Sequence, residues 1–135
     1  MSWQPLAAGR RTRALRSLFR SARQKDRPET RGLQLMRNWL SAEQRAQFDR
    51  FGYFDVRGSV SGKKYRIHFG VSANIQEIGD DGKAFCGWCF APDRHLVPGD
   101  VMLAQKIALE TSECTALAIA NQFPPILPNG LRFAC

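Results

Sequence analysis

The chain has 135 residues, of which 44% are hydrophobic, and it carries a formal net charge of +8 at pH 7. This length fits one domain with short extensions, and this apolar content excludes a fully disordered protein. No stretch reaches the roughly 18 apolar residues that a membrane-spanning helix needs, and no secretory signal is recognisable at the N-terminus. We therefore expect a soluble cytoplasmic protein whose positive charge favours an anionic partner.

Most of this positive charge lies in the first 31 residues, which hold nine of the 20 Lys and Arg residues but only two of the 12 acidic residues. Residues 10–25 have a helical period, in which Leu15, Leu18 and Phe19 share one face and Arg side chains occupy the other. We expect an amphipathic helix here. A linker should follow over residues 26–32, because Pro28 disfavours continuation of that helix.

Two further helices are predicted before any strand. The first covers residues 33–40. The second begins at Ser41, because Gln44 stands three residues later and completes a capping box. Gly52 suits the position that follows a helix end, so this helix should end near Phe51.

The hydrophobic period then changes from helical to two. Strands are expected over residues 53–58, 64–69, 74–78 and 84–90, with turns at 60–63 and 80–82. The simplest arrangement of these strands is a four-stranded antiparallel meander.

The second of these strands alternates most clearly. Its core face should carry Tyr65, Ile67 and Phe69, and its exposed face should carry Lys64, Arg66 and His68.

After a loop over residues 92–98, Asp100 is expected to act as the N-cap of a helix that ends near Glu110. A last helix should cover residues 113–121. The pattern predicts an α+β fold, in which a small antiparallel sheet of three or four strands is flanked by helices and preceded by a basic helical arm.

The predicted organisation has three parts. They are a basic amphipathic arm and linker over residues 1–32, a single α+β domain over 33–123 and an irregular C-terminal tail over 124–135.

Four short runs carry a resemblance to other proteins. They are Trp39-Leu40-Ser41, Tyr65-Arg66-Ile67, Cys89-Phe90 and Gly99-Asp100-Val101-Met102-Leu103-Ala104-Gln105-Lys106. With these runs, the stretch from Trp39 to Asn121 resembles a group of small uncharacterised bacterial proteins. The resemblance implies a domain boundary near Trp39 and implies no particular activity.

The cationic residues are the leading candidates for a binding site, because Lys and Arg neutralise the phosphates of nucleic acid. The candidate nucleic-acid-binding residues are Arg10, Arg11, Arg13, Arg16, Arg20, Arg23, Lys63, Lys64 and Arg66. Nucleic acid or another anionic polymer is therefore the expected partner.

Four alternatives remain for the arm. A protein adaptor would place the stripe of Leu15, Leu18 and Phe19 in a partner groove. The same stripe would also enter a membrane surface. The arm composition is also typical of an organelle transit peptide. Finally, the arm would have no partner if the stripe packed on its own domain and the Arg face pointed to solvent.

No motif of a catalytic site accompanies these residues, so we expect a protein that is not an enzyme and has no catalytic residues. Cys86 and Cys89 form a C-x-x-C pair, but residues three apart on a strand point to opposite faces. We therefore expect structural cysteines rather than a zinc or redox site, and neither a metal nor a cofactor. His95 is expected to be exposed, and Lys106 is expected at the edge of an apolar helix.

Overall fold

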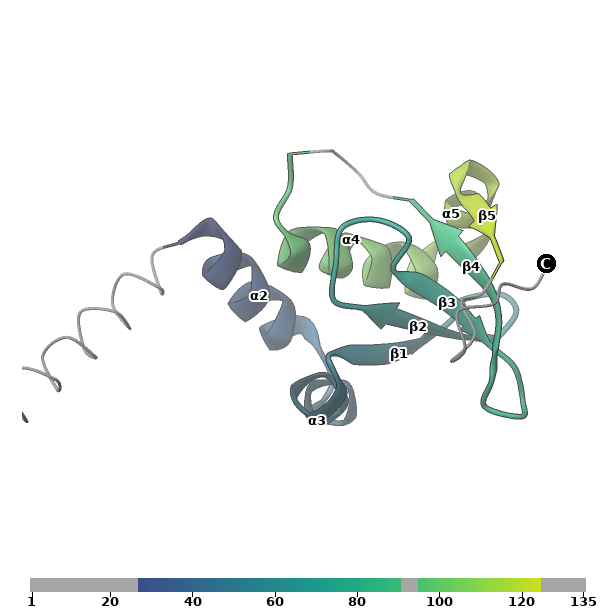
Figure 1. Cartoon of the computed structure of the whole chain (residues 1–135), viewed down its shortest axis with the longest axis horizontal. Helices are drawn as coiled ribbons and strands as arrows, with labels where there is room; N and C mark the ends of the chain where they lie inside the picture. Colours follow the sequence, from purple (N-terminus) through teal and green to yellow (C-terminus); the bar gives the residue numbers. More distant parts are fainter. Residues whose placement is uncertain (1–26, 91–94, 125–135) are drawn as a thin grey trace, which may run out of the picture.

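The structure is a computed structural model, and it describes residues 27–90 and 95–124. Helices and an antiparallel sheet form the predicted α+β fold (Figure 1). The helices are α2 (Pro28–Trp39), α3 (Ala42–Phe51), α4 (Pro98–Thr111) and α5 (Glu113–Ile119). The strands are β1 (Tyr53–Arg57), β2 (Lys64–His68), β3 (Ile75–Ile78), β4 (Ala84–Cys89) and β5 (Asn121–Phe123). None of these helices is long and apolar enough to cross a membrane.

The sheet has five strands in the order β1-β2-β3-β4-β5, and all neighbours are antiparallel. The predicted meander is therefore confirmed for the first four strands, and the fifth strand corrects the expected number. β5 lies within the predicted last helix and the residues that follow it. It pairs with β4 through Gly87 opposite Phe123, and three residues are too few for a period of two to be recognised.

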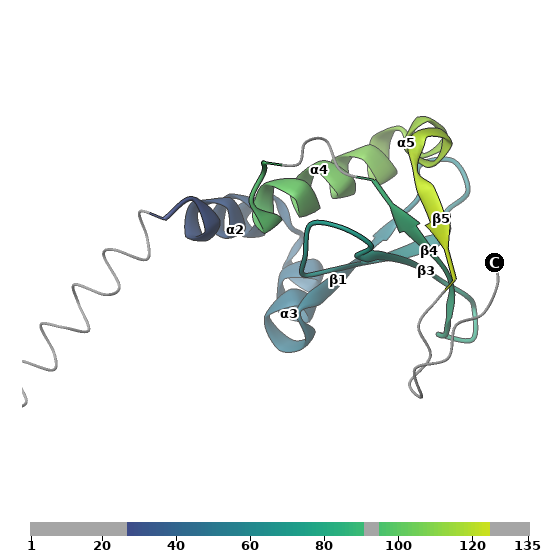
Figure 2. The ribbon, with the colours of Figure 1, turned by 45° about the horizontal axis from the view of Figure 1, so that its top comes forward.

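The hydrophobic core lies between one face of the sheet and the helices α2 and α4 (Figure 2). Phe54, Tyr65 and Ile67 are fully buried on the sheet side, as the alternation predicts for Tyr65 and Ile67. The expectation for Phe69 is wrong, because this side chain is 56% exposed. Phe69 follows the end of β2, where the strand no longer fixes the direction of its side chain.

Two predicted helix boundaries near α3 are confirmed. The Ser41 side chain accepts a hydrogen bond from the Gln44 amide, and the Gln44 side chain accepts one from the Ser41 amide, which completes the capping box. Gly52 ends α3 with a φ of 76°, a left-handed conformation that favours glycine. Both signals depend on residues close in sequence, so the local pattern was sufficient to locate them.

Two other boundaries differ from the expectation. α2 begins at Pro28, so five of the seven residues of the expected linker are helical and α2 crosses the predicted boundary after residue 32. α4 begins at Pro98 with Val97 as its N-cap, and Asp100 lies inside the first turn instead of capping it. The reason is the same in both helices, because proline fixes a helical φ and needs no hydrogen-bond acceptor at the first position.

Side chains of α3 form hydrogen bonds to the free edge of the outer strand β1. Gln47 accepts a hydrogen bond from the Asp55 amide at 2.8 Å, and Gln44 donates one to the Asp55 carbonyl oxygen at 3.0 Å. These backbone groups lie at the free edge of β1, where another strand would otherwise pair. The two glutamines therefore block this edge at its centre.

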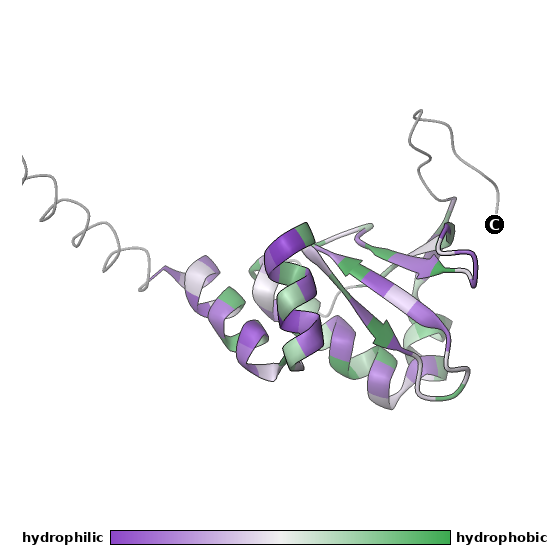
Figure 3. Cartoon of the chain, turned by 90° about the horizontal axis from the view of Figure 1, so that it is seen from below, coloured by the Kyte–Doolittle hydropathy of each residue, from purple (hydrophilic) through white to green (hydrophobic). Residues whose placement is uncertain are grey.

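The sheet face that points away from α4 carries no described helix over its centre. Figure 3 views the molecule from this side, and α3 lies beside the strands at the β1 end. This face presents Arg57 directly opposite Lys64, and Asp55 directly opposite Arg66. Polar side chains are therefore gathered on the open face.

Candidate functional site

An open groove of about 540 Å³ lies between the turn that joins β1 to β2 and the hairpin of β3 and β4. Three cationic side chains line it, those of Arg57, Lys63 and Lys64, together with the ring of Phe85 and the carboxylates of Glu77 and Asp80. The groove therefore carries three positive and two negative charges beside an aromatic ring.

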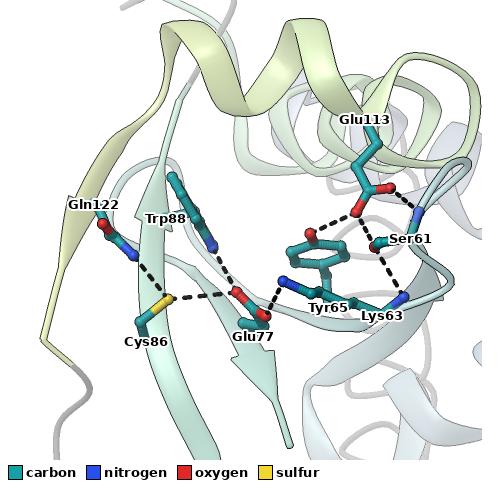
Figure 4. A network of polar contacts seen from close by, with 8 residues as sticks. All are labelled: Ser61, Lys63, Tyr65, Glu77, Cys86, Trp88, Glu113 and Gln122. Carbon is teal, nitrogen blue, oxygen red and sulfur yellow. Dashed lines mark hydrogen bonds and ion pairs between the residues drawn. The ribbon is translucent and has the colours of Figure 1, made fainter. Parts of the chain in front are cut away.

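The cations of the groove differ in their partners. Lys63 forms an ion pair of 3.2 Å with Glu77, whose carboxylate also accepts a hydrogen bond from the indole of Trp88 (Figure 4). Neither Arg57 nor Lys64 forms an ion pair with a carboxylate of the described residues. Arg57 donates one hydrogen bond to the Gly62 carbonyl oxygen at 3.2 Å, so its positive charge and that of Lys64 are the two in the groove that no described carboxylate pairs.

The turn that presents these cations is held by Glu113, the first residue of α5. Its carboxylate accepts hydrogen bonds from the Val60 amide at 2.9 Å, the Ser61 amide at 2.7 Å and the Tyr65 hydroxyl at 2.6 Å. The Ser61 hydroxyl donates a further bond, as Figure 4 shows. We call Glu113 and the groups of Val60, Ser61 and Tyr65 the Glu113 clasp.

Two features make the clasp tight. Glu113 is only 2% exposed, so its charge is stabilised by these donors instead of by water. Gly58 lies against it so closely that a Cβ atom there would be 2.2 Å from a carboxylate oxygen. Only glycine at position 58 leaves room for the carboxylate, so the sequence of the turn and the position of Glu113 depend on each other.

Burial of the Glu113 carboxylate would by itself raise its pKa, but the hydrogen bonds from Ser61, Tyr65 and Val60 outweigh this and lower the pKa to about 2. Burial raises the pKa of Tyr65 above its ordinary value, and the bond to Glu113 raises it further. The clasp is therefore an ionised carboxylate held by a neutral phenol over the whole neutral pH range.

We expect the clasp to make the fold acid-sensitive. Because the folded-state pKa of Glu113 is lowered to about 2 from 4.5, its stabilising effect is complete above about pH 4.5. It should be lost as the pH falls towards 2, by about 3 kcal/mol in the free energy of unfolding. Urea unfolding followed by circular dichroism over this pH range at constant ionic strength measures the loss. Equal losses in the wild type and in Glu113→Gln would contradict the assignment.

The structure places two of the predicted binding residues, Lys63 and Lys64, together in the groove. Arg66 differs from its expected exposed position, because it is half-buried and bonds both oxygens of Asp55, at 2.9 and 3.1 Å. Its guanidinium also lies 4.2 Å from the centre of the Tyr53 ring. A phosphate contact of Arg66 stays a prediction, and it would have to compete with this ion pair.

Several predicted residues lie outside the described part of the chain. They are the arm residues Arg10, Arg11, Arg13, Arg16, Arg20 and Arg23 and the helix over residues 10–25, and most of the C-terminal tail.

The two strand cysteines differ in their environment. Cys86 is buried and accepts a hydrogen bond from Gln122, whereas Cys89 is half-buried and accepts one from the Ala73 amide. Residues 27–90 and 95–124 contain no group of three His, Cys, Asp or Glu residues that could hold a metal ion.

The polar residues near α4 have separate positions. His95 is exposed, as expected. Lys106 is 9% exposed and pairs with Glu110, so it is more buried than the edge position predicted for it. These side chains do not converge on the groove.

Two residues of the site were missed in the sequence. Arg57 ends the strand before the turn, and only the strand register brings it opposite Lys64. Glu113 was recognised only as the start of a helix. The signal that would have pointed to it is the turn before Lys63, which contains Ser59 and Ser61 and whose backbone amides require an acceptor.

No protein-family model, no curated protein and no solved structure matches this chain.

Proposed function

We propose that the protein is a non-enzymatic accessory protein that binds nucleic acid electrostatically, through its Arg-rich arm and the groove. The observation that supports this most is that Arg57 and Lys64 line the groove without an ion pair to a described carboxylate. Cations that the fold does not neutralise attract phosphates and release their counterions. The groove therefore suits the backbone of a nucleic acid.

The arm and the groove have different roles in this proposal. The first 31 residues carry a net charge of +7 and supply long-range attraction that does not depend on base sequence. The turn beside the groove is held by the Glu113 clasp, so the backbone that carries Lys63 and Lys64 is positioned before the ligand arrives. Such preorganisation reduces the conformational entropy lost on binding.

The proposal is tested by fluorescence anisotropy with labelled DNA and RNA at several salt concentrations. In a plot of log K against log salt, Lys64→Gln should reduce the slope by about 0.7 to 0.9, the value for one phosphate contact. The combined change of Arg13, Arg16 and Arg20 to Ala should reduce it by roughly two to three units.

The matched control is Arg50→Gln, which removes one exposed positive charge outside the groove. It should leave the slope unchanged. No binding, or binding that does not depend on salt, would overturn the proposal. Salt-tolerant binding of a protein that fails on Leu18→Asp would instead indicate the adaptor function.

A further inference from the structure

One side of α2 carries two large apolar side chains that remain largely exposed. Leu35 is 48% exposed and Trp39 is 61% exposed. They stand four residues apart, so they lie next to each other on one side of the helix. On the neighbouring side of α2, Met36 is buried in the core and Gly32 is buried against the start of α4. The exposed pair therefore extends the apolar surface of the core into solvent.

The segment that precedes α2 reaches this surface through a short connection. Residues 1–26 lie outside the described part of the chain and lead directly into Arg27. Arg27 is extended, with φ −71° and ψ 140°, as expected for a residue before proline, so α2 begins after a change of direction. Only residues 26 and 27 separate α2 from the helix predicted over residues 10–25. Connections of this length are typical between antiparallel helices that pack on each other.

The apolar residues of the predicted helix have the same spacing as the exposed pair on α2. Leu15 and Phe19 stand four residues apart, as Leu35 and Trp39 do. Phe19 comes eight residues before Arg27, and Leu35 follows Arg27 by eight residues. Leu15 and Trp39 are each twelve residues from Arg27. In an antiparallel pair of helices that turns at this residue, Phe19 therefore lies level with Leu35, and Leu15 lies level with Trp39.

We infer that the arm folds back on the domain, so that Leu15 packs on Trp39 and Phe19 packs on Leu35. Removal of these four side chains from water drives the contact. It also stabilises the arm helix, because an isolated helix of this length is at best marginally stable in water. The inference goes beyond the proposed function and does not depend on it, since it concerns only the apolar face of the arm. The opposite face, which carries the Arg side chains, points away from α2.

Limited trypsin digestion of the full-length protein tests the inference, because trypsin cleaves after Lys and Arg and the arm is rich in Arg. Cleavage of a reversibly docked segment follows the population of its undocked form. A synthetic peptide of residues 1–26 gives the cleavage rate of an undocked arm. Cleavage within residues 10–25 of the full-length protein, followed by mass spectrometry, should be about ten-fold slower than in the peptide.

Trp39→Ser and Phe19→Ser should each raise the cleavage rate of the arm to about that of the peptide with the same arm sequence. The double variant should be cleaved no faster than either single variant, because each substitution already releases the arm. Phe19→Ser leaves the sequence of the domain unchanged, so faster cleavage in this variant does not reflect a domain that fails to fold. Ile119→Ser is the matched control, because Ile119 is 74% exposed on α5, and it should leave the rate unchanged.

Equal cleavage of the wild-type protein and the peptide would overturn the inference. Protection that grows with protein concentration would also overturn it, because a second copy would then cover α2. Protection that survives Trp39→Ser would mean that the arm is held elsewhere, with the same consequence. Salt-dependent binding of nucleic acid is measured separately on the same proteins. An unprotected arm with such binding would leave the proposed function standing, and a protected arm without it would leave only the inference standing.

Discussion

Replacement of Glu113 by Gln should lower the free energy of unfolding at pH 7 by about 3 kcal/mol. The carboxylate accepts bonds from two backbone amides and two hydroxyl groups in a site that water barely reaches. A glutamine has the same shape but only one accepting oxygen, and its amide group would face donors. At least one buried donor would then lack an acceptor, and the bonds that remain would lose their charge.

Urea unfolding of the wild type and of Glu113→Gln measures this difference directly. Asp80→Asn is the matched control, because Asp80 is exposed in the turn between β3 and β4 and removal of its charge should change stability by less than about 0.5 kcal/mol. A loss below about 1 kcal/mol in Glu113→Gln would show that the charge of the carboxylate is not needed. The clasp would then be an ordinary hydrogen-bond network.

The fold was predictable where the determining residues are neighbours in sequence. Ser41 and Gln44 are three residues apart, and Gly52 directly follows the helix that it ends. The burial of Tyr65 and Ile67 follows from a period of two within a single strand. In each case the interaction that determines the structure lies within one turn or one strand. A short stretch of sequence is therefore enough to predict it.

The features that could not be predicted depend on distant residues. Glu113 bonds Tyr65 and Val60, which are 48 and 53 positions away in sequence. β5 consists of three residues, and they form a strand because they pair with the edge of β4. Nothing within these short segments distinguishes them from a helix start or a loop, since tertiary contacts determine their structure.

The candidate site shows the same division. Lys63 and Lys64 are adjacent in the sequence and were recognised together. Arg57 belongs to the preceding strand, and only the antiparallel register places it opposite Lys64. The pairing of Arg66 with Asp55 has the same origin, and it explains why a residue expected to be exposed is half-buried. Prediction of the register is therefore the step that would have completed the site.

Gly99→Ala should destabilise the protein by about 3 kcal/mol, because α2 and α4 cross with their backbones in contact. A Cβ atom on Gly99 would lie 2.1 Å from the carbonyl carbon of Gly32 and 2.3 Å from the amide nitrogen of Leu33. Because these are backbone atoms, a change of side-chain rotamer cannot relieve the overlap. The two helices would have to separate. Their separation would disturb the packing around Met36, which is fully buried on α2.

Whether Gly99→Ala stabilises or destabilises the protein decides whether the backbones of α2 and α4 are in contact. In an open helical position, a change from Gly to Ala stabilises by up to about 1 kcal/mol, because alanine has the higher helix propensity. Gly32→Ala is the closest comparison, since its Cβ atom would meet side-chain atoms of Val97 and Asp100 that can move. Its cost should therefore be smaller, about 1 kcal/mol. Thermal unfolding of both variants tests this order, and a stabilising Gly99→Ala would show that the two helices do not cross at this distance.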